Sequence, residues 1–545
     1  MDNNSHMSVI DYLRFAARRF SERPALVGDA ALSYSQLYLR VRRWAAQFAS
    51  SGLEAGERVA IWLPKCPEYL VALYAAMEVG GVYVPLDGAQ PAERAKKILA
   101  SANPQVLVTD YAHLQELADL QLSSLRLIVV LDDPSHTLTV GKGAPAVISV
   151  ATLDQSRAFV TPRYPASEDL AAILFTSGST GTPKGVQISY GNLHCFLSWA
   201  QQEFSLSEHD VFANHAGFHF DLSTFDVFAA AASGGAIWII PESEQRDVSG
   251  LLEGIRRYNV SVWYSVPSVL TLLVNREAFC SRSARSLRYV LFAGEVFPIK
   301  QLRTLRSLLS ESCQLYNLYG PTETNVCLYH KVRPEDLLLE RPVYIGRTLP
   351  GVEAAIVDSD GCPVAGDKQL GELVVSGSCV TPGYWQMEFS ENRAYHRCRR
   401  HATGDLVSLE NGLIRYHGRR DRMIKVQGNR VELGEIESAM ERMPGLAEVA
   451  VVAEFEWGSD VIVAYFVAQS DEHAPTVIDI KTFCRDRLPR YMIPRRAHRL
   501  AELPRNANGK IDYRGLARTW AEERRARVVN DADPVTARVK GATNA

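Results

Sequence analysis

Short apolar runs separated by longer mixed segments are the feature that most restricts the fold of this 545-residue sequence. Clear examples of these runs are residues 58–63, 105–109, 127–131 and 290–293. Their β-branched and aliphatic residues are typical of strands that are buried on both faces. Segments with a helix-like pattern lie between the runs, as at residues 67–77 and 248–258. Because strands and helices alternate, the sequence predicts an α/β fold in which helices cover parallel sheets.

The pattern changes twice in the second half of the chain. Residues 346–416 are richer in short alternating strands, which indicates a β-rich subdomain. We therefore expect a large N-terminal domain at residues 1–417 and, where the charged segment GRRD interrupts the pattern, a hinge at 418–421. A small, mobile α+β lid domain is expected at residues 422–521, and the polar segment 522–545 is expected to be a flexible tail.

Charge and cysteine content exclude several classes of protein. The sequence has 59 Lys and Arg against 62 Asp and Glu, so it lacks the positive charge that attracts nucleic acid or an anionic membrane. The nine cysteines include no C-x-x-C pair, which is typical of reduced thiols. No apolar run approaches the roughly 18 residues that a membrane-spanning helix needs. We expect a cytoplasmic protein that binds neither nucleic acid nor a membrane.

A loop rich in Gly, Ser and Thr follows an apolar run at residues 176–185 (TSGSTGTPKG). Glycines let the backbone approach an anion closely, and hydroxyl and N–H groups donate to phosphate oxygens. Lys184 adds a positive charge, but Gly185 follows it where a Walker A loop has Ser or Thr. A flexible linker is the alternative, although a linker would not normally place Pro-Lys beside a buried strand. The loop therefore predicts phosphate binding.

This loop and further segments resemble the ordered motifs of the adenylate-forming (ANL) superfamily. That superfamily includes nonribosomal-peptide adenylation domains, acyl-CoA and aryl-CoA synthetases, and firefly-type luciferases. The matching segments, in chain order, are residues 32–37, 80–87, 176–185, 220–223, 317–323, 371–377, 403–405, 418–421, 429–437, 488–494 and 508–510. One departure is the Arg-His-Ala segment at 400–402, where the family usually has an aromatic residue.

The resemblance implies a reaction in which a carboxylate attacks the α-phosphorus of ATP and pyrophosphate leaves. Such catalysis consists of positioning the reactants and stabilising the charge on phosphoryl oxygens. The implied cofactors are ATP and Mg²⁺, with Glu323 as the metal ligand. The implied catalytic residues are Lys184, Thr322, Glu323 and Lys510. Lys510 would bridge the substrate carboxylate and the nucleotide from a mobile C-terminal loop.

The resemblance also assigns the nucleotide site. Tyr319 would stack on adenine, Asp405 would accept the ribose hydroxyls and Arg419 would contact ribose or phosphate. The implied ATP-binding residues are Thr176, Ser177, Gly178, Ser179, Thr180, Gly181, Lys184, Asn317, Tyr319, Gly320, Thr322, Asp405, Arg419 and Lys510. Asp421 occupies the family's hinge position. Considered singly, Asp405 is also compatible with an Asx turn, Glu323 with a helix cap and Lys510 with a solvated turn.

The FDLS segment at residues 220–223 indicates the substrate class. In amino-acid-activating relatives its Asp pairs with the α-ammonium group, because a buried carboxylate needs a cation. The implied pocket residues are Asp221, Leu222, Phe225, Tyr264, Leu291, Ala293, Leu318, Val326, Cys327 and Lys510. This apolar lining resembles that of L-proline activators that supply pyrrole-2-carboxyl carrier thioesters. Pipecolate, valine and alanine are the alternative substrates.

The expected function is activation of L-proline to prolyl-AMP, followed by transfer to the phosphopantetheine thiol of a peptidyl carrier protein. Only 545 − 510 = 35 residues follow Lys510, too few for a carrier domain, so we expect the carrier to act in trans. An acyl-CoA or aryl-CoA ligase is an alternative against which Asp221 argues. The intact Lys184 and Glu323 argue against a catalytically silent nucleotide-binding regulator, and an oxygen-dependent luciferase is a further alternative.

Overall fold

The chain forms two compact units in the computed structural model. The described residues are 8–117, 119–120, 122–132, 144–178, 182–276, 279–280, 282–364, 366–387, 393–456, 459–470, 474–505, 511–513 and 515–517. Of these described residues, the first unit holds those up to 177 and those at 182–421 and 427–429, and the second holds Gly178, 422–426 and those from 430 onward. Among the described residues, no helix has both the length and the apolar character needed to cross a membrane.

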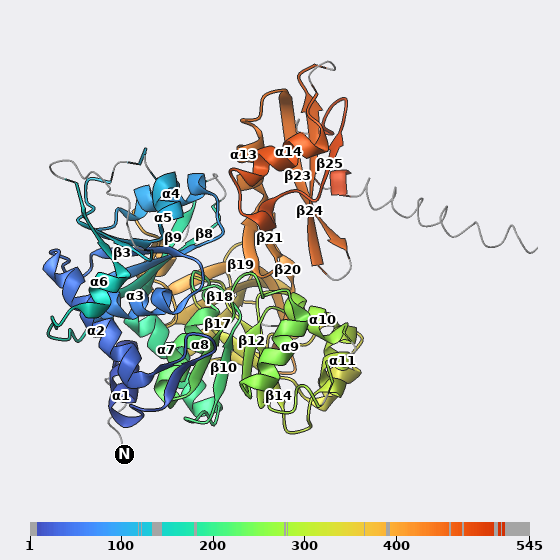
Figure 1. Cartoon of the computed structure of the whole chain (residues 1–545). Helices are drawn as coiled ribbons and strands as arrows, with labels where there is room; N and C mark the ends of the chain where they lie inside the picture. Colours follow the sequence, from blue (N-terminus) through green and yellow to red (C-terminus); the bar gives the residue numbers. More distant parts are fainter. Residues whose placement is uncertain are drawn as a thin grey trace, which may run out of the picture. The chain divides into compact units, whose positions relative to one another are not determined.

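The first unit contains two large sheets accompanied by helices (Figure 1). One of them has seven strands. Its strands, in sheet order, are β7 (Ala146–Ser149), β6 (Leu127–Val130), β5 (Val106–Thr109), β3 (Arg58–Leu63), β4 (Val82–Asp87), β8 (Leu170–Thr176) and β9 (Lys184–Ser189). All neighbours are parallel except β8 and β9, which form an antiparallel pair. The helices that accompany this sheet in the chain are α2 (Tyr34–Ser50), α3 (Pro67–Glu78), α4 (Ala92–Ala102), α5 (Tyr111–Glu116) and α6 (Val150–Gln155).

The second large sheet has nine strands, with a parallel centre and antiparallel edges. Its strands, in sheet order, are β16 (Arg347–Thr348), β15 (Leu328–Lys331), β14 (Gln314–Tyr319), β13 (Tyr289–Phe292), β12 (Val262–Ser265), β10 (Val211–Asn214), β11 (Ala236–Ile239), β1 (Pro24–Val27) and β2 (Leu32–Ser33). The helices of this half are α1 (Val9–Arg19), α7 (Tyr190–Glu203), α8 (Ser223–Ser233), α9 (Val248–Arg257), α10 (Pro267–Val274), α11 (Ile299–Leu308) and the 3₁₀ helix η1 (Pro334–Leu338).

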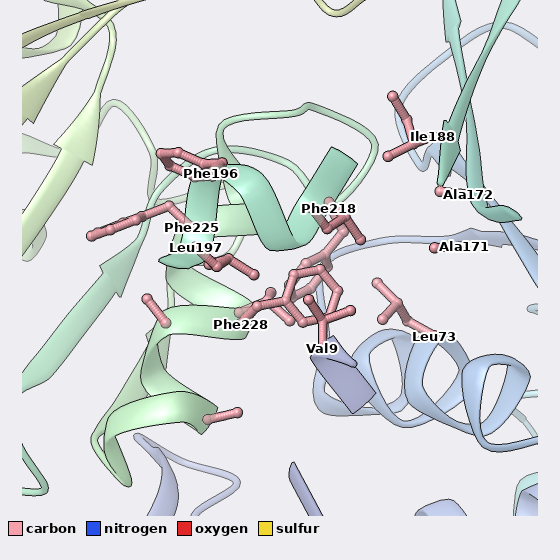
Figure 2. Close-up of a cluster of buried hydrophobic side chains, with 14 of the residues drawn as sticks. Val9, Leu73, Ala171, Ala172, Ile188, Phe196, Leu197, Phe218, Phe225 and Phe228 are labelled. Atoms are coloured by element: carbon pink, nitrogen blue, oxygen red, sulfur yellow. The ribbon is translucent and has the colours of Figure 1, made fainter. Parts of the chain in front are cut away.

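The main core of the first unit lies between these two sheets. Side chains of α1, α3, α7 and α8 form one buried cluster with residues of both sheets, and Figure 2 shows Phe196 and Phe228 of this cluster together with Leu73 and Ile188. Alternate residues of the strands point to the opposite faces. Trp62 of β3 packs with α4, and Trp263 of β12 packs with α9 and α11. Burial on both faces explains why these strands read as continuous apolar runs.

Local sequence signals fix several helix ends. Ser33 accepts a hydrogen bond from the backbone of Gln36 at the start of α2, and Ser189 with Asn192 forms a capping box at α7. Pro67 and Pro267 occupy first-turn positions of α3 and α10, where the missing N–H has no helical partner anyway. These residues place each helix directly after a strand, so the connecting loops stay short.

A third sheet of the first unit is wholly antiparallel and contributes residues to the site. Its strands are β17 (Val352–Val357), β18 (Gly371–Gly377), β19 (Arg400–Glu410) and β20 (Leu413–Arg419), and the short helix α12 (Arg393–Arg397) precedes β19. Asp405 of β19 pairs in register with Arg419 of β20. The antiparallel register thus places an acid and a base side by side at the end of the sheet.

The second unit is an α+β structure. Its elements are β21 (Met423–Val426), β22 (Asn429–Glu432), α13 (Leu433–Met440), β23 (Leu446–Glu456), β24 (Ser459–Ala468), α14 (Val477–Arg485), the 3₁₀ helix η2 (Arg490–Met492) and β25 (Arg496–Arg499). Strands β23 and β24 are antiparallel, and β25 joins β24 in parallel. Both α13 and α14 bury apolar side chains against this sheet. Within this unit Arg422 contacts Glu437 through two hydrogen bonds, 2.7 and 3.2 Å long.

The predicted fold class is confirmed. The runs predicted at residues 58–63 and 290–293 form β3 and β13, and the predicted helix at 67–77 is α3. The β-rich subdomain at 346–416 corresponds to the third sheet. The exact domain boundaries and the mobility of the lid stay predictions.

Candidate active site

The candidate amino-acid site lies where the parallel strands of the nine-stranded sheet end. In sheets of this kind ligands bind outside the carboxyl ends of the strands. Tyr264 of β12 and Leu291 of β13 are neighbours in register, and Asp221 lies on the segment that leaves β10 for α8. The structure therefore gathers these residues from separate parts of the sequence.

Asp221 is nearly buried, with an exposed fraction of 9%. Its backbone carbonyl accepts hydrogen bonds from the backbone N–H (3.1 Å) and the hydroxyl (2.6 Å) of Thr224, which anchors it at the start of α8. Burial raises the pKa of the Tyr264 hydroxyl well above its usual value, and the Asp221 carboxylate raises it further. A carboxylate at the edge of an apolar core is suited to binding a cation such as an ammonium group.

Phe225 is fully buried at the centre of an aromatic cluster. Its ring meets that of Tyr264 edge to face at 5.8 Å, and the rings of Phe196, Phe204 and Phe212 lie at 5.9 Å. Figure 2 shows Phe196 beside Phe225. Because rings packed on several sides have little freedom to move, Phe225 gives this part of the site a fixed shape.

The remaining predicted pocket residues belong to the same buried cluster. They are Leu222, Leu291, Ala293, Leu318, Val326 and Cys327, each with an exposed fraction of 7% or less. Burial raises the pKa of the Cys327 thiol to about 12, so this thiol stays protonated at neutral pH. The set thus offers an uncharged apolar surface.

A hydrogen-bonded chain joins the residues predicted to bind adenine and ribose. The Tyr319 hydroxyl donates to Oδ2 of Asp405, and Nη1 of Arg419 donates to Oδ1 of the same carboxylate at 2.8 Å. Arg419 also donates to both carboxylate oxygens of Asp421, at 2.7 and 2.6 Å. The predicted hinge residue is therefore linked by charge to the predicted nucleotide residues.

Burial and neighbouring charges set the protonation states of the residues in this hydrogen-bonded network. Although burial acts in the opposite direction, the contacts with Asp421 and Asp405 raise the pKa of Arg419, so it remains a cation. Burial raises the pKa of Tyr319 well above its usual value, and Asp405 raises it further. Asp405 accordingly keeps a protonated hydroxyl and a guanidinium as its two donors.

Glu323 is buried beside two histidines and a tyrosine. Its Oε1 accepts a hydrogen bond from the Tyr384 hydroxyl at 2.7 Å, and its Oε2 lies 4.0 Å from Nε2 of His401. Nδ1 of His401 is 3.1 Å from Nε2 of His396. Burial lowers the pKa of His396, which favours its neutral form. No cluster of three or more His, Cys, Asp or Glu ligands occurs among the described residues, so no all-protein metal cage is found there.

The donor set at Glu323 fits Mg²⁺. Mg²⁺ prefers oxygen ligands and is usually held by one or two carboxylates together with substrate phosphates, rather than by a protein cage. Glu323 offers one such carboxylate, and it follows Thr322 on the segment that leaves β14. Its Oε1 already holds a hydroxyl donor that fixes its orientation.

The nucleotide segment and the amino-acid segment are joined directly. Nδ2 of Asn325 donates to the hydroxyl of Thr224 at 3.1 Å, and that hydroxyl in turn donates to the carbonyl of Asp221. Asn317, within β14, donates through Nδ2 to the carbonyl of Tyr344 at 2.8 Å. The two half-sites therefore share one hydrogen-bonded framework.

The predicted phosphate loop connects two antiparallel strands. Thr176 ends β8, Lys184 begins β9, and the two are partners in register. Ser177 is buried, with an exposed fraction of 3%. The predicted residues Ser179, Thr180, Gly181 and Lys510 lie outside the described residues, so their contacts are not part of the site described above.

Sequence reasoning missed a second polar cluster next to the amino-acid site. Lys65, Asn214 and Asp226 are all buried, and Nδ2 of Asn214 donates to Oδ2 of Asp226 at 3.2 Å. The available signals were a lysine between an apolar strand and an apolar helix, and an acid directly after Phe225 in an otherwise apolar helix. Tyr384 and His396 were missed too. The Tyr384 contact to Glu323 joins residues that are far apart in the sequence, and His396 contacts His401 from the short helix α12, outside every motif.

Comparison with known families identifies the class of protein. The AMP-binding enzyme family matches residues 13–385, and the family of AMP-binding enzyme C-terminal domains matches residues 435–510. The chain belongs to the AMP-binding enzyme family, which confirms the resemblance to adenylate-forming enzymes drawn from its motifs.

Individual relatives narrow the comparison. An L-proline--[L-prolyl-carrier protein] ligase of Streptomyces coelicolor is 48% identical over 512 residues, covering 93% of this chain and 96% of that one. A ligase of the same name from Pseudomonas fluorescens is 38% identical, covering 92% and 97%. Among solved structures, the adenylation domain AlmE of Vibrio cholerae, in complex with glycyl-adenosine-5'-phosphate, is similar with a TM-score of 0.79 at 25% identity, covering 96% and 99%.

Proposed function

We propose that this protein activates L-proline with ATP and transfers the prolyl group to the phosphopantetheine thiol of a carrier protein. The observation that carries the proposal is similarity along nearly the whole chain to two L-proline--[L-prolyl-carrier protein] ligases. The geometry agrees with it, since Asp221 acts on the Tyr264 hydroxyl, and the ring of Tyr264 packs against the fully buried Phe225. A carboxylate at one end and apolar walls beyond it suit an amino acid with a small, uncharged side chain.

In the first half-reaction, Asp221 accepts the secondary ammonium group of proline and thereby orients its carboxylate. Asp405 and Tyr319 hold the ribose and adenine of ATP. One proline carboxylate oxygen then forms a bond to the α-phosphorus, and the bond to the bridging oxygen of pyrophosphate breaks. When both reactants are held in line, the bimolecular reaction becomes effectively unimolecular. This positioning accounts for a large part of such catalysis.

Charged groups are proposed to bind the metal ion and the phosphates. Glu323 would hold Mg²⁺, which when bound neutralises charge on the phosphate oxygens. Lys184 and the preceding loop would contact the leaving phosphates, and Lys510 would bridge the two substrates. Cationic groups are effective here because negative charge develops on phosphoryl oxygens in the transition state.

In the second half-reaction, the carrier's thiol sulfur attacks the prolyl carbonyl carbon. A thioester bond forms, the bond from that carbon to the AMP phosphate oxygen breaks, and the thiol proton is lost to solvent. The products are prolyl-carrier thioester and AMP. The carrier is proposed to act as a separate protein.

ATP–pyrophosphate exchange tests the substrate directly. The assay compares proline with pipecolate, valine, alanine and the other common amino acids, and we expect proline to give the strongest signal. Loading of a phosphopantetheinylated carrier is then followed by intact mass. Strong exchange with another amino acid while proline is silent would refute the proline assignment. A coenzyme A-dependent product formed from an acyl or aryl acid would instead support a CoA ligase.

A further inference from the structure

Lys65 is a buried amine that has no role in the proposed reaction. It lies between β3 of the seven-stranded sheet and α3, with an exposed fraction of 7%. Its Nζ donates to the backbone carbonyls of Asn214 at 2.6 Å and His215 at 3.1 Å. The same Nζ is 5.7 Å from the ring centre of Phe218. One side chain therefore reaches from the first sheet to three residues that follow or end β10 of the other sheet.

The segment that Lys65 contacts leads directly to Asp221. The backbone N–H of Phe220 donates to the carbonyl of Gly217 at 3.0 Å, and the Ser223 hydroxyl donates to the carbonyl of Phe220 at 2.8 Å. These short bonds fold residues 217–223 into a compact connection that follows the two residues whose carbonyls Lys65 contacts. A displacement at its start is consequently passed on to the carboxylate at position 221.

Other groups around the amine support the same segment. The carbonyl of Asn214 also accepts from the backbone of Ile240 at 3.2 Å, and that of His215 also accepts from Nε2 of Gln245 at 3.0 Å. The backbone N–H of Lys65 donates to both carboxylate oxygens of Glu242, at 2.8 and 3.0 Å. The end of β10 is thus held by the side chains of Lys65 and Gln245 and by the backbone of Ile240, and Glu242 holds the backbone of Lys65 in turn.

The side chain of Asn214 ties this segment to α8. Its Nδ2 donates to Oδ2 of Asp226, whereas its own Oδ1 and the Oδ1 of Asp226 are buried without a hydrogen-bond partner. Burying polar groups in this way is costly, and an apolar side chain could fill the same space. This buried polar cluster includes Asp226, which acts on Tyr264 as Asp221 does, and it therefore points to a role in fixing the geometry of the site.

We propose that Lys65 is a positioning residue of the amino-acid site, which holds the segment 214–221 so that Asp221 faces the ammonium group of the substrate. The inference rests on the proposed function, because it requires that Asp221 binds the amino group. Lys65 does not touch the reacting atoms in this proposal. It acts through the two backbone carbonyls that it contacts.

The test compares Lys65→Met with the double variant Lys65→Met/Asp226→Asn in ATP–pyrophosphate exchange. In the single variant we expect the KM for proline to rise about tenfold, a change of about 1.4 kcal/mol, while the KM for ATP changes less than about twofold. The double variant shows whether a raised KM for proline comes from lost stability or from lost positioning of Asp221. Asn at position 226 can accept from Nδ2 of Asn214 and donate to its Oδ1, so we expect thermal stability to recover while the KM for proline stays raised.

Lys300→Met on the exposed surface of α11 is the matched control, and it should leave both KM values unchanged. A folded double variant with the wild-type KM for proline would overturn the proposal, and so would equal rises in the KM for proline and for ATP. Wild-type protein that activates a different amino acid would refute only the proline assignment, and the comparison would then use that amino acid. Wild-type protein that activates no amino acid would refute both proposals.

Discussion

At the scale of single residues, Lys65 and Asp226 are ionisable groups in surroundings that disfavour their charged forms. Burial lowers the pKa of Lys65 from 10.5 to about 7, although Glu242 and Asp226 act in the opposite direction. Burial raises the pKa of Asp226 well above its usual value, opposed by the hydrogen bond from Asn214 and by Lys65. A neutral amine has two N–H groups, which matches the two carbonyls that Lys65 contacts.

This lowered pKa predicts a pH dependence of stability. Between pH about 7 and 10.5 the unfolded state binds a proton at Lys65 that the folded state does not bind. The contribution of Lys65 to the free energy of unfolding should therefore rise with pH across this window, by at most about 1.4 kcal/mol per pH unit. Urea unfolding of wild type and Lys65→Met from pH 7 to 10 measures the difference. Parallel curves for the two proteins would contradict the lowered pKa.

A second prediction at this scale concerns Glu323 and Mg²⁺. Glu323→Gln keeps an oxygen that can accept from Tyr384 but removes the negative charge. We expect the Mg²⁺ concentration for half-maximal exchange to rise at least about tenfold, with the melting temperature nearly unchanged, because charge contributes more to metal affinity than to this hydrogen bond. Titration of Mg²⁺ in the exchange assay measures the change. Glu353→Gln, on the exposed side of β17, is the control, and equal effects of both changes would exclude metal binding by Glu323.

The sequence motifs predicted the chemical roles of individual residues, but they did not predict which residues contact one another. Asp405 and Arg419 were assigned by resemblance, and the structure shows that they are cross-strand partners. Lys65 and Asp226 carry no motif, since an isolated lysine or acid in the sequence is most often a surface residue. Their importance follows from contacts between two sheets, which no local pattern contains. The departure at His401 was visible in the sequence, but its approach to Glu323 was not.

At the scale of elements, the connection from β14 to β15 is packed so tightly that one glycine determines its path. A Cβ added at Gly320 would lie 1.5 Å from the carbonyl oxygen of Asn325, which is far inside van der Waals contact. The same connection carries Thr322 and Glu323, and Asn325 bonds to Thr224 near Asp221. Because the obstacle is backbone, it cannot move without displacing these residues.

Gly320→Ala should therefore lower activity much more than an ordinary glycine substitution. We expect kcat/KM in the exchange assay to fall by at least about a hundredfold, since small misplacements of catalytic groups have effects of this size. Gly366→Ala is the control, because its nearest neighbours are side-chain atoms of the exposed Gln369, which can move. Circular dichroism and the melting temperature show whether the fold persists. Near-normal activity of a folded Gly320→Ala protein would contradict the assigned role of this connection.

Elements with a strong local pattern were predicted well. The apolar runs at 58–63 and 127–131 and the helix at 248–258 correspond to β3, β6 and α9 within one residue at each end. Strand order was not predictable in this way. The pairing of β8 with β4, or of β12 with β10, depends on crossovers of many residues that leave no local signal. The aromatic packing around Phe225 likewise depends on which elements become neighbours.

At the scale of the whole molecule, the division into two units falls at Asp421, the residue that resemblance assigns to the hinge. Asp421 is 47% exposed at its side chain and pairs with Arg419, which also binds Asp405. A residue at a unit boundary whose side chain is half exposed can change its backbone torsions without unpacking a core. The charged segment of the sequence predicts a domain boundary here, and both this boundary and rotation of the second unit between half-reactions remain predictions.

That rotation predicts a specific effect of proline at position 421. Asp421→Pro fixes φ near −65°, so a hinge that must change this torsion becomes restricted to one state. If that state is the one used for adenylation, we expect ATP–pyrophosphate exchange to stay within about threefold of wild type, while carrier loading falls by at least about tenfold. Asp421→Ala is the matched control, because it removes the ion pair with Arg419 but leaves the torsion free, and it should support both half-reactions. Equal carrier loading by the Pro and Ala variants would show that position 421 need not move, and loss of both activities in both variants would assign Asp421 to the nucleotide site through Arg419 instead.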